Sequence, residues 1–207
     1  MVFKNFFQRV LISLFFILAY LLISYYSFDY IFYLIIIIYL FIFFEVFLNF
    51  KKLKYFILSY LFIGFIIMLN IEYDIKYFKK FNLMILIIIF FDIFSYFIGS
   101  MYGKNYILPK ISPNKTLEGF LGGVFFSFLI SFIYTKIIQI DFNLKLIIFV
   151  TIIIFSSFIG DIMESIFKRK NNLKNSSNFL PGHGGFFDRF DSFILSLVAY
   201  YFLYKIL

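Results

Sequence analysis

The chain has 207 residues, of which 63% are hydrophobic and only 14% are charged. Soluble globular domains carry roughly 25% charged residues, so a water-soluble fold of this composition would leave too much apolar surface uncovered. Apolar runs of roughly 18 residues or more recur along the chain, and a helix of that length spans a bilayer. The composition therefore excludes a soluble domain and predicts an all-α, polytopic integral membrane protein.

The distribution of charge limits the class of partner. The formal net charge is +8, but the 19 Lys and Arg residues lie in short loops beside the apolar runs and form no long basic tract. This distribution indicates membrane lipid and nucleotide phosphates as partners, and it argues against nucleic acid. The absence of cysteine excludes disulfides and thiolate metal ligands.

The apolar runs predict about seven transmembrane helices. The first begins at Val10, after Lys4 and Arg9, and no small-residue cleavage site follows it, so we interpret it as an uncleaved span. The remaining spans are expected at residues 30–49, 55–71, 82–101, 119–139, 144–164 and 192–207.

Lys and Arg are unevenly shared between the two sides of these spans. Most of them fall on the side that holds the N-terminus and the loops 102–118 and 165–191. By the positive-inside rule this side is cytoplasmic, so we expect a multi-pass protein of the inner membrane with both loops facing the cytoplasm. The three prolines also lie in these loops, which indicates irregular backbone there.

Carboxylates are scarce in the apolar runs, so their positions are informative. Glu45, Asp92, Asp161 and Glu164 lie within or at the edge of such runs, where an acidic side chain is costly and usually marks a function. Asp92 and Tyr96 are four residues apart and therefore share one face of a helix. That face is expected to point into protein or water.

The expected helix at 144–164 leads into a second polar face. Asp161, Glu164 and Lys168 follow one another at intervals of three and four residues, so they share one side of the helix. Arg169 adds a further cation next to this face. The alternative is a lipid-anchoring helix end with snorkelling lysines, which explains the cations but not the acids.

The loop PGHGGFFDRFD, residues 181–191, contains three glycines around the only histidine, His183. Gly184 and Gly185 would let backbone amides approach phosphate oxygens closely. This predicts that His183 contacts a bound ligand, although a lone histidine is more often structural or incidental.

The same loop ends in alternating acidic and basic residues. Asp188 and Asp191 are three residues apart and can share an Mg²⁺ ion, which prefers a few carboxylates together with substrate phosphates. Arg189 lies between them and can neutralise phosphate charge through bidentate contacts.

The segment SPNKTLEG, residues 112–119, precedes the fifth expected span. Ser112 and Lys115 are candidate contacts for a substrate. The alternative is a helix-capping turn from Thr116 to Glu118 with a lysine that only sets topology. Together the two cytoplasmic loops supply carboxylates, cations and glycine-rich backbone at the bilayer surface, which favours phosphoryl or nucleotidyl transfer to a membrane-embedded acceptor.

The segment SIFKRKNNLKNSSNFLPGHGGFFDRFD, residues 165–191, resembles the C-terminal signature of the phosphatidate cytidylyltransferase family. Every signature position matches except Asn175, where the family has Asp. The resemblance continues upstream through DIFSYFIG at 92–99, SPNKTLEG at 112–119 and GDIMES at 160–165. A motif of this length and variety is specific.

The resemblance implies that CTP and phosphatidic acid react to give CDP-diacylglycerol and pyrophosphate in phospholipid biosynthesis. It also implies a requirement for Mg²⁺, room for a monovalent cation such as K⁺, and a homodimer as a compatible state. On this basis residues 1–80 are interpreted as N-terminal transmembrane helices and residues 81–207 as the catalytic transmembrane region.

The resemblance also assigns roles to the candidate residues. Catalytic residues would be Asp161, Asp188, Asp191, His183 and Lys168. Substrate would be bound by Lys115, Arg169, Arg189, Gly184, Gly185, Ser112, Asp92 and Tyr96. Ligands of Mg²⁺ would be Asp161, Glu164, Asp188 and Asp191.

Two other functions fit parts of the sequence. One is a related CTP-dependent enzyme that acts on archaeol phosphate, a polyprenol or phytol. The other is a transporter whose buried acids line an ion path. A transporter leaves the clustering of glycine, histidine and basic residues in the cytoplasmic loops unexplained.

Overall fold

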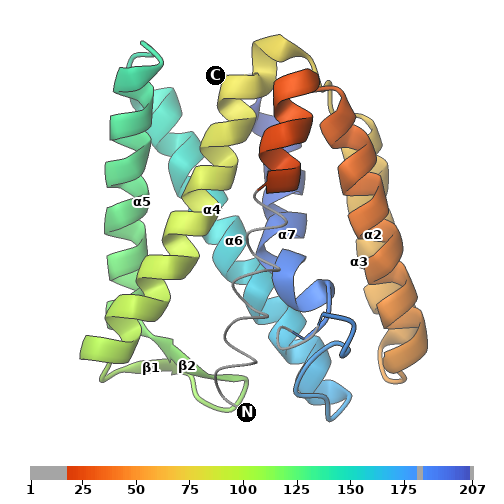
Figure 1. Ribbon diagram of the computed structural model, residues 1–207. Coiled ribbons are helices and arrows are strands. Elements are labelled where there is room, and N and C mark those ends of the chain that lie inside the picture. Colours follow the sequence, from red (N-terminus) through yellow and green to blue (C-terminus); the bar gives the residue numbers. More distant parts are fainter. Residues whose placement is uncertain (1–17, 181–183, 206–207) are drawn as a thin grey trace. The chain divides into compact units, whose positions relative to one another are not determined.

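The structure is a computed structural model that describes residues 18–180 and 184–205. A helix at residues 18–26 comes first. It is followed by α2 (Tyr30–Asn49), α3 (Lys54–Leu69), α4 (Ile75–Tyr102), β1 (Tyr106–Leu108), β2 (Ser112–Thr116), α5 (Leu117–Ile137), α6 (Leu144–Lys170) and α7 (Phe187–Leu203) (Figure 1). The expected all-α class is confirmed for these residues. The short hairpin of β1 and β2 was not predicted, because its strands lack an alternating apolar pattern.

Four helices of the described residues are long and apolar enough to cross a bilayer: α2, α4 from Tyr77 onward, α5 and α6. Helix α3 is also apolar but has only 16 residues. Three of the long helices coincide closely with the spans expected at 30–49, 119–139 and 144–164. The part of the first expected span that precedes residue 18 lies outside the described residues.

The chain divides into two compact units. The first comprises Met1–Phe78 and Phe167–Asp191, and the second comprises Lys79–Ile166 and Ser192–Leu207. The loop 165–191, which we assigned to the catalytic region 81–207, thus falls for the most part into the unit of the N-terminal helices. Helices α6 and α7 each contribute residues to both units.

In the first unit, α2 and α3 pack against each other, and each buries aliphatic side chains, such as Ile42 in α2 and Leu61 in α3. Asn171, just after α6, fixes the turn between these two helices. Its side-chain oxygen accepts hydrogen bonds from the backbone amides of Lys51 at 2.8 Å and Lys52 at 2.6 Å. Its amide nitrogen donates to the Lys52 carbonyl at 2.9 Å. The chain that leads into the glycine-rich loop is therefore anchored before it reaches that loop.

In the second unit, small residues let α4 and α5 approach closely. A side chain at Gly123 would overlap the Ser95 hydroxyl and Phe91 of α4. Further along α5, the buried Ser127 donates a hydrogen bond to the Ile87 carbonyl at 3.4 Å. Close backbone contact at small residues is how helices associate in lipid, where burial of apolar surface gives little drive.

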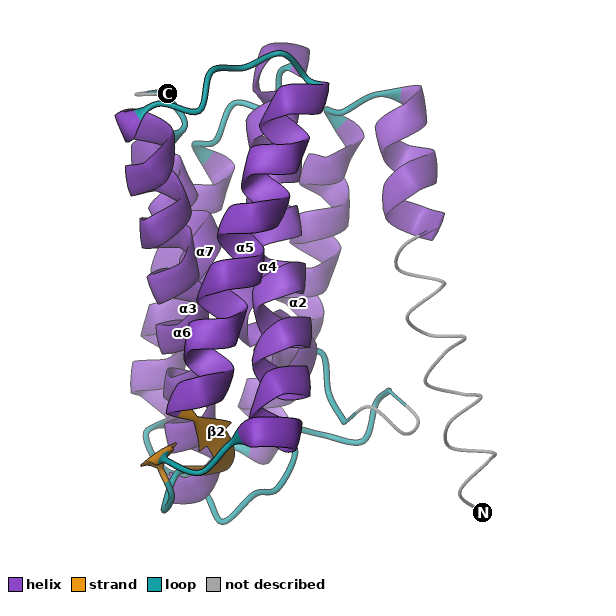
Figure 2. Cartoon of the chain, turned by 90° about the vertical axis from the view of Figure 1, so that its left-hand side faces the viewer, coloured by secondary structure: helices purple, strands orange, loops and turns teal. Residues whose placement is uncertain are grey.

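The hairpin of β1 and β2 joins the ends of α4 and α5 (Figure 2). Its strands pair antiparallel, with Tyr106 opposite Thr116 and Leu108 opposite Ser112. Glu118, in the first turn of α5, accepts hydrogen bonds from the Lys104 amide at 3.1 Å and the Asn105 side chain at 2.7 Å. These contacts hold the start of the hairpin against α5 and place β2 above a pocket of the same unit.

Candidate active site

A pocket of about 220 Å³ lies within the second unit. Its polar lining comes from α4, β2 and α6, and phenylalanines form its apolar walls. The lining residues are Phe91, Asp92, Ser95, Tyr96, Ser112, Asn114, Lys115, Thr116, Phe120, Phe158 and Asp161. Five of the residues proposed from sequence therefore meet here: Asp92, Tyr96, Ser112, Lys115 and Asp161.

The pocket is organised by an ion pair between β2 and α6. Lys115 Nζ lies 2.7 Å from Asp161 Oδ2, and both side chains are only partly exposed. The same ammonium group sits 4.7 Å from the centre of the Phe158 ring, which favours a cation over its face. Lys115 is thus oriented toward the pocket by a charge and by an aromatic wall.

The backbone next to Lys115 is fixed by a helix cap. The Thr116 hydroxyl accepts a hydrogen bond from the Gly119 amide at 3.2 Å, which satisfies one of the free amides at the start of α5. The two interpretations of the segment 112–119 are therefore compatible: Thr116 caps the helix, and Lys115 enters the pocket.

Not every polar group that lines the pocket has a hydrogen-bond partner among the described residues. The buried Ser95 hydroxyl has no hydrogen-bond partner among the described residues. Asp92 and Asp161 bring two carboxylates to the same pocket, with a single lysine as counter-charge. A ligand that supplies both acceptors and positive charge, such as a phosphate with a divalent cation, would satisfy these groups.

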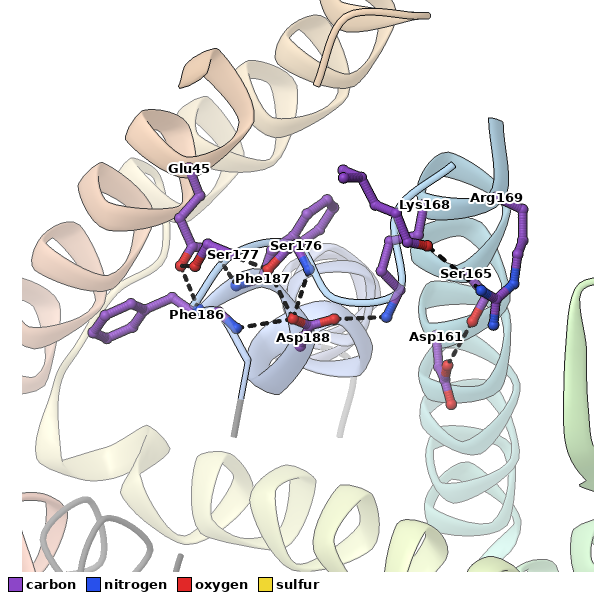
Figure 3. A network of polar contacts seen from close by, with 12 residues as sticks. Glu45, Asp161, Ser165, Lys168, Arg169, Ser176, Ser177, Phe186, Phe187 and Asp188 are labelled. Atoms are coloured by element: carbon purple, nitrogen blue, oxygen red, sulfur yellow. Dashed lines mark hydrogen bonds and ion pairs between the residues drawn. The ribbon is translucent and has the colours of Figure 1, made fainter. Parts of the chain in front are cut away.

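The polar face predicted on α6 is present, but its members differ in burial. Ser165 donates a hydrogen bond to Asp161 Oδ1 at 3.4 Å (Figure 3). Glu164 is only 1% exposed, so it lies inside the protein. Lys168 lies one helical turn further along α6, belongs to the first unit and is part of a different cluster of polar residues.

That cluster centres on Asp188 in the first turn of α7 (Figure 3). Asp188 Oδ1 lies 2.6 Å from Lys168 Nζ. Oδ2 accepts hydrogen bonds from the Ser176 amide at 2.8 Å, the Ser176 hydroxyl at 2.9 Å and the Gly185 amide at 2.9 Å. The donors within the protein therefore occupy both carboxylate oxygens.

These donors set the charge of Asp188. Burial raises the pKa of its carboxyl, but the hydrogen bonds from Lys168, Gly185 and Ser176 and the charge of Lys168 together outweigh burial and hold the pKa below its ordinary value. Asp188 is thus ionised at neutral pH. Its contribution to stability is present above the ordinary pKa of an aspartate and is lost as the pH falls through the lowered value.

A second carboxylate, Glu45 of α2, reaches the same loop. Glu45 is fully buried, and its Oε1 accepts hydrogen bonds from the Ser177 hydroxyl and the Phe186 amide, both at 2.7 Å. Its Oε2 accepts from the Phe187 amide at 2.9 Å and lies 3.2 Å from the Ser176 hydroxyl. Glu45 was noted in the sequence as an acid in an apolar run, but its partners are more than a hundred residues away and could not be read from it.

Space requires glycine at two positions of the loop, Gly184 and Gly185. Gly184 has φ +88°, a conformation that favours glycine, and a side chain there would lie 2.6 Å from Asp188 Oδ2. A side chain at Gly185 would overlap the Ser176 hydroxyl and lie 2.6 Å from both oxygens of Glu45. His183 lies outside the described residues, so its predicted role stays a prediction.

The remaining candidates lie at the borders of this cluster. Arg169 is exposed and donates to the Leu173 carbonyl at 3.4 Å. Arg189 is exposed and Asp191 half-buried in the first turns of α7. Asn175 is exposed, and its side chain lies 3.3 Å from the position that a side chain at Gly184 would take.

Comparison with protein families gives a match to the cytidylyltransferase family over residues 2–207. The chain belongs to this family. The match includes both the pocket of the second unit and the loop cluster of the first.

Three relatives that are similar to this chain share the same name. A phosphatidate cytidylyltransferase from Staphylococcus epidermidis is 44% identical over 108 residues, which are 51% of this chain and 41% of that protein. Its namesake from Bacillus subtilis is 41% identical over 111 residues, 53% of this chain and 41% of that protein. One from Staphylococcus aureus is 44% identical over 108 residues, with the same coverage as the first. The chain thus matches about two fifths of each relative's length.

A metal ion fits the donors of the pocket if phosphates complete its coordination. Among residues 18–180 and 184–205, no three acidic or histidine side chains gather closely enough to hold a metal by themselves. Mg²⁺, however, is commonly held by one or two carboxylates together with substrate phosphates. Asp92 and Asp161 offer such a pair, whereas the oxygens of Asp188 already accept four contacts from the protein.

Proposed function

We propose that the chain is a phosphatidate cytidylyltransferase that transfers CMP from CTP to phosphatidic acid, giving CDP-diacylglycerol and pyrophosphate. The single observation that supports this best is the Lys115 and Asp161 ion pair in a pocket of a cytidylyltransferase-family chain. The names of the relatives indicate phosphatidate as the acceptor.

In the proposed reaction an oxygen of the phosphatidate phosphate attacks the α-phosphorus of CTP. One P–O bond forms, the bond to the pyrophosphate oxygen breaks, and pyrophosphate leaves with the electron pair. Lys115 would offset negative charge on the phosphate oxygens. The Ser95 hydroxyl, which has no partner in the described residues, would donate a hydrogen bond to one of them.

The proposed cofactor is Mg²⁺, with Asp92 and Asp161 as the pocket residues that would hold it. When bound, the ion would neutralise phosphate charge and hold the reacting groups in line. We keep Glu164, Asp188 and Asp191 as further candidate ligands from the sequence, and K⁺ as a candidate monovalent cation.

The wider setting is part of the same proposal. We infer about seven transmembrane helices in the inner membrane, with the loops 102–118 and 165–191 on the cytoplasmic side, where CTP is available. A homodimer is the oligomeric state suggested by the resemblance.

Purified protein given radiolabelled CTP and phosphatidic acid is expected to place label in a lipid product when Mg²⁺ is present and not when it is chelated. Archaeol phosphate, a polyprenol and phytol in place of phosphatidic acid should give far less product. Label in one of these acceptors, but not in phosphatidic acid, would contradict the proposed substrate. No lipid product with any acceptor would contradict the enzyme class.

Asn175→Asp is expected to lower the Mg²⁺ concentration needed for half-maximal activity. The new carboxylate would stand beside Gly184, close to Asp188, which is kept as a further candidate Mg²⁺ ligand, and would restore the acid of the family signature. The measurement is an Mg²⁺ titration of both proteins at saturating CTP. Equal titration curves would show that residue 175 has no part in metal binding, and an inactive wild type made active by Asp would mean that this chain has lost the family's activity.

A further inference from the structure

We propose that Glu45 is a positioning residue that holds residues 184–187 and Asp188 in the arrangement needed for nucleotide transfer. The expected kinetic effect rests on the proposed function. The structural role of Glu45 can be tested by a measurement that does not require enzyme activity. All the residues involved belong to the first unit.

The number and direction of the hydrogen bonds to Glu45 support this role. Each Glu45 oxygen receives one backbone amide, from Phe186 or Phe187, and one serine hydroxyl lies within reach of each. The two amides lie at the start of α7, where backbone donors have no partner within the helix. Glu45 therefore fixes the point at which the loop turns into α7, one residue before Asp188.

A carboxylate at position 45 is costly to bury. Glu45 is 0% exposed and lies near the C-terminal end of a predominantly apolar helix. A buried carboxylate is stable only when hydrogen bonds replace its water. A neutral side chain could pack in α2 at lower cost, so the contacts with the loop explain its presence.

Glu45 is also connected to Asp188 through a shared serine. The Ser176 hydroxyl has one hydrogen, yet it lies 3.2 Å from Glu45 Oε2 and 2.9 Å from Asp188 Oδ2. Ser176 thus links the two carboxylates, and a change at Glu45 alters which of them the hydroxyl serves. Through this serine and through the Phe187 amide, Glu45 controls the orientation of the Asp188 carboxylate toward Lys168.

Glu45→Gln is the most informative variant because it keeps the size of the side chain and replaces one of its two acceptor oxygens with an amide nitrogen. In either orientation the amide nitrogen of glutamine would face the backbone amide of Phe186 or of Phe187, so one of these donors loses its partner. Glu45→Asp keeps the charge but is one methylene shorter, and an intermediate effect is expected. Ile42→Ala, also 0% exposed and in α2, is the matched control that weakens packing without removing a hydrogen bond to the loop.

The first measurement is hydrogen–deuterium exchange of the Phe186 and Phe187 amides in purified, detergent-solubilised protein. Glu45→Gln should speed exchange of at least one of them by about tenfold or more relative to wild type. Ile42→Ala should leave both amides as protected as the wild type at a temperature where it stays folded. Unchanged protection in Glu45→Gln would overturn the proposal.

The second measurement is steady-state kinetics of the same proteins. Glu45→Gln should lower kcat/KM for CTP by about tenfold and raise the Mg²⁺ requirement, while the KM for phosphatidic acid stays unchanged. Ile42→Ala should show neither change. Faster exchange combined with wild-type kinetics would overturn the positioning role. If the wild type makes no lipid product, the proposed function fails, and the exchange data alone decide whether Glu45 holds the loop.

Discussion

Asp161→Asn is expected to lower kcat by about 100-fold or more while the protein remains folded in detergent. The amide keeps the size of the side chain but removes the charge that pairs with Lys115 at 2.7 Å and that would help to hold Mg²⁺. Lys115 would then be free to turn toward Asp92 in the same pocket. The measurement is the initial rate of lipid product at saturating CTP, together with thermal unfolding of the purified variant.

Asp141→Asn is the matched control, because Asp141 is exposed in the turn before α6 and does not line the pocket. It should keep wild-type activity. The double variant Asp161→Asn with Lys115→Met should form lipid product no more slowly than the less active of the two single variants. The effects of residues that act as a unit are not additive. Near-normal turnover of Asp161→Asn would remove this pocket from the reaction.

The sequence predicted the long helices well because their signal is local. An apolar run of the right length forms a helix in lipid whatever it packs against, so the span expected at 30–49 coincides with α2. Helix α7 begins at Phe187, five residues before the last expected span, 192–207. Its start is set by the contacts of Glu45 with the amides of Phe186 and Phe187, and that pairing cannot be read from the local sequence.

The candidate site was predictable where residue type alone was informative. Asp92 and Tyr96 share a helical face by their spacing, and they do line the same pocket. The sequence allows two roles for Lys115, a substrate contact or a lysine that only sets topology. Only the hairpin geometry shows that Lys115 reaches Asp161. The spacing of Asp188 and Asp191 predicts a metal ligand at Asp188, but the sequence does not reveal that four contacts from the protein converge on the Asp188 oxygens.

Gly185→Ala is expected to destabilise the protein by about 2 kcal/mol or more, because overpacking a filled site forces side chains and backbone to shift. The added methyl group would overlap the Ser176 hydroxyl and lie 2.6 Å from both Glu45 oxygens. It would therefore separate the loop from α2 and withdraw the Gly185 amide, which donates to Asp188 at 2.9 Å. Lower thermal stability and loss of most activity should appear together.

Two further variants separate this cause from a general effect of replacing glycine. At Gly122 of α5 an added methyl group would overlap the Cδ1 of Ile98 and lie 3.0 Å from its Cβ, so Gly122→Ala should also lower thermal stability but should leave the contacts of Glu45 and Asp188 with the loop unchanged. Ser176→Ala combined with Gly185→Ala removes one of the overlapping groups but leaves the Glu45 oxygens in place, so it should recover only part of the lost stability. Wild-type stability of Gly185→Ala would show that the loop does not pack against Glu45 and Ser176 as closely as their hydrogen bonds require.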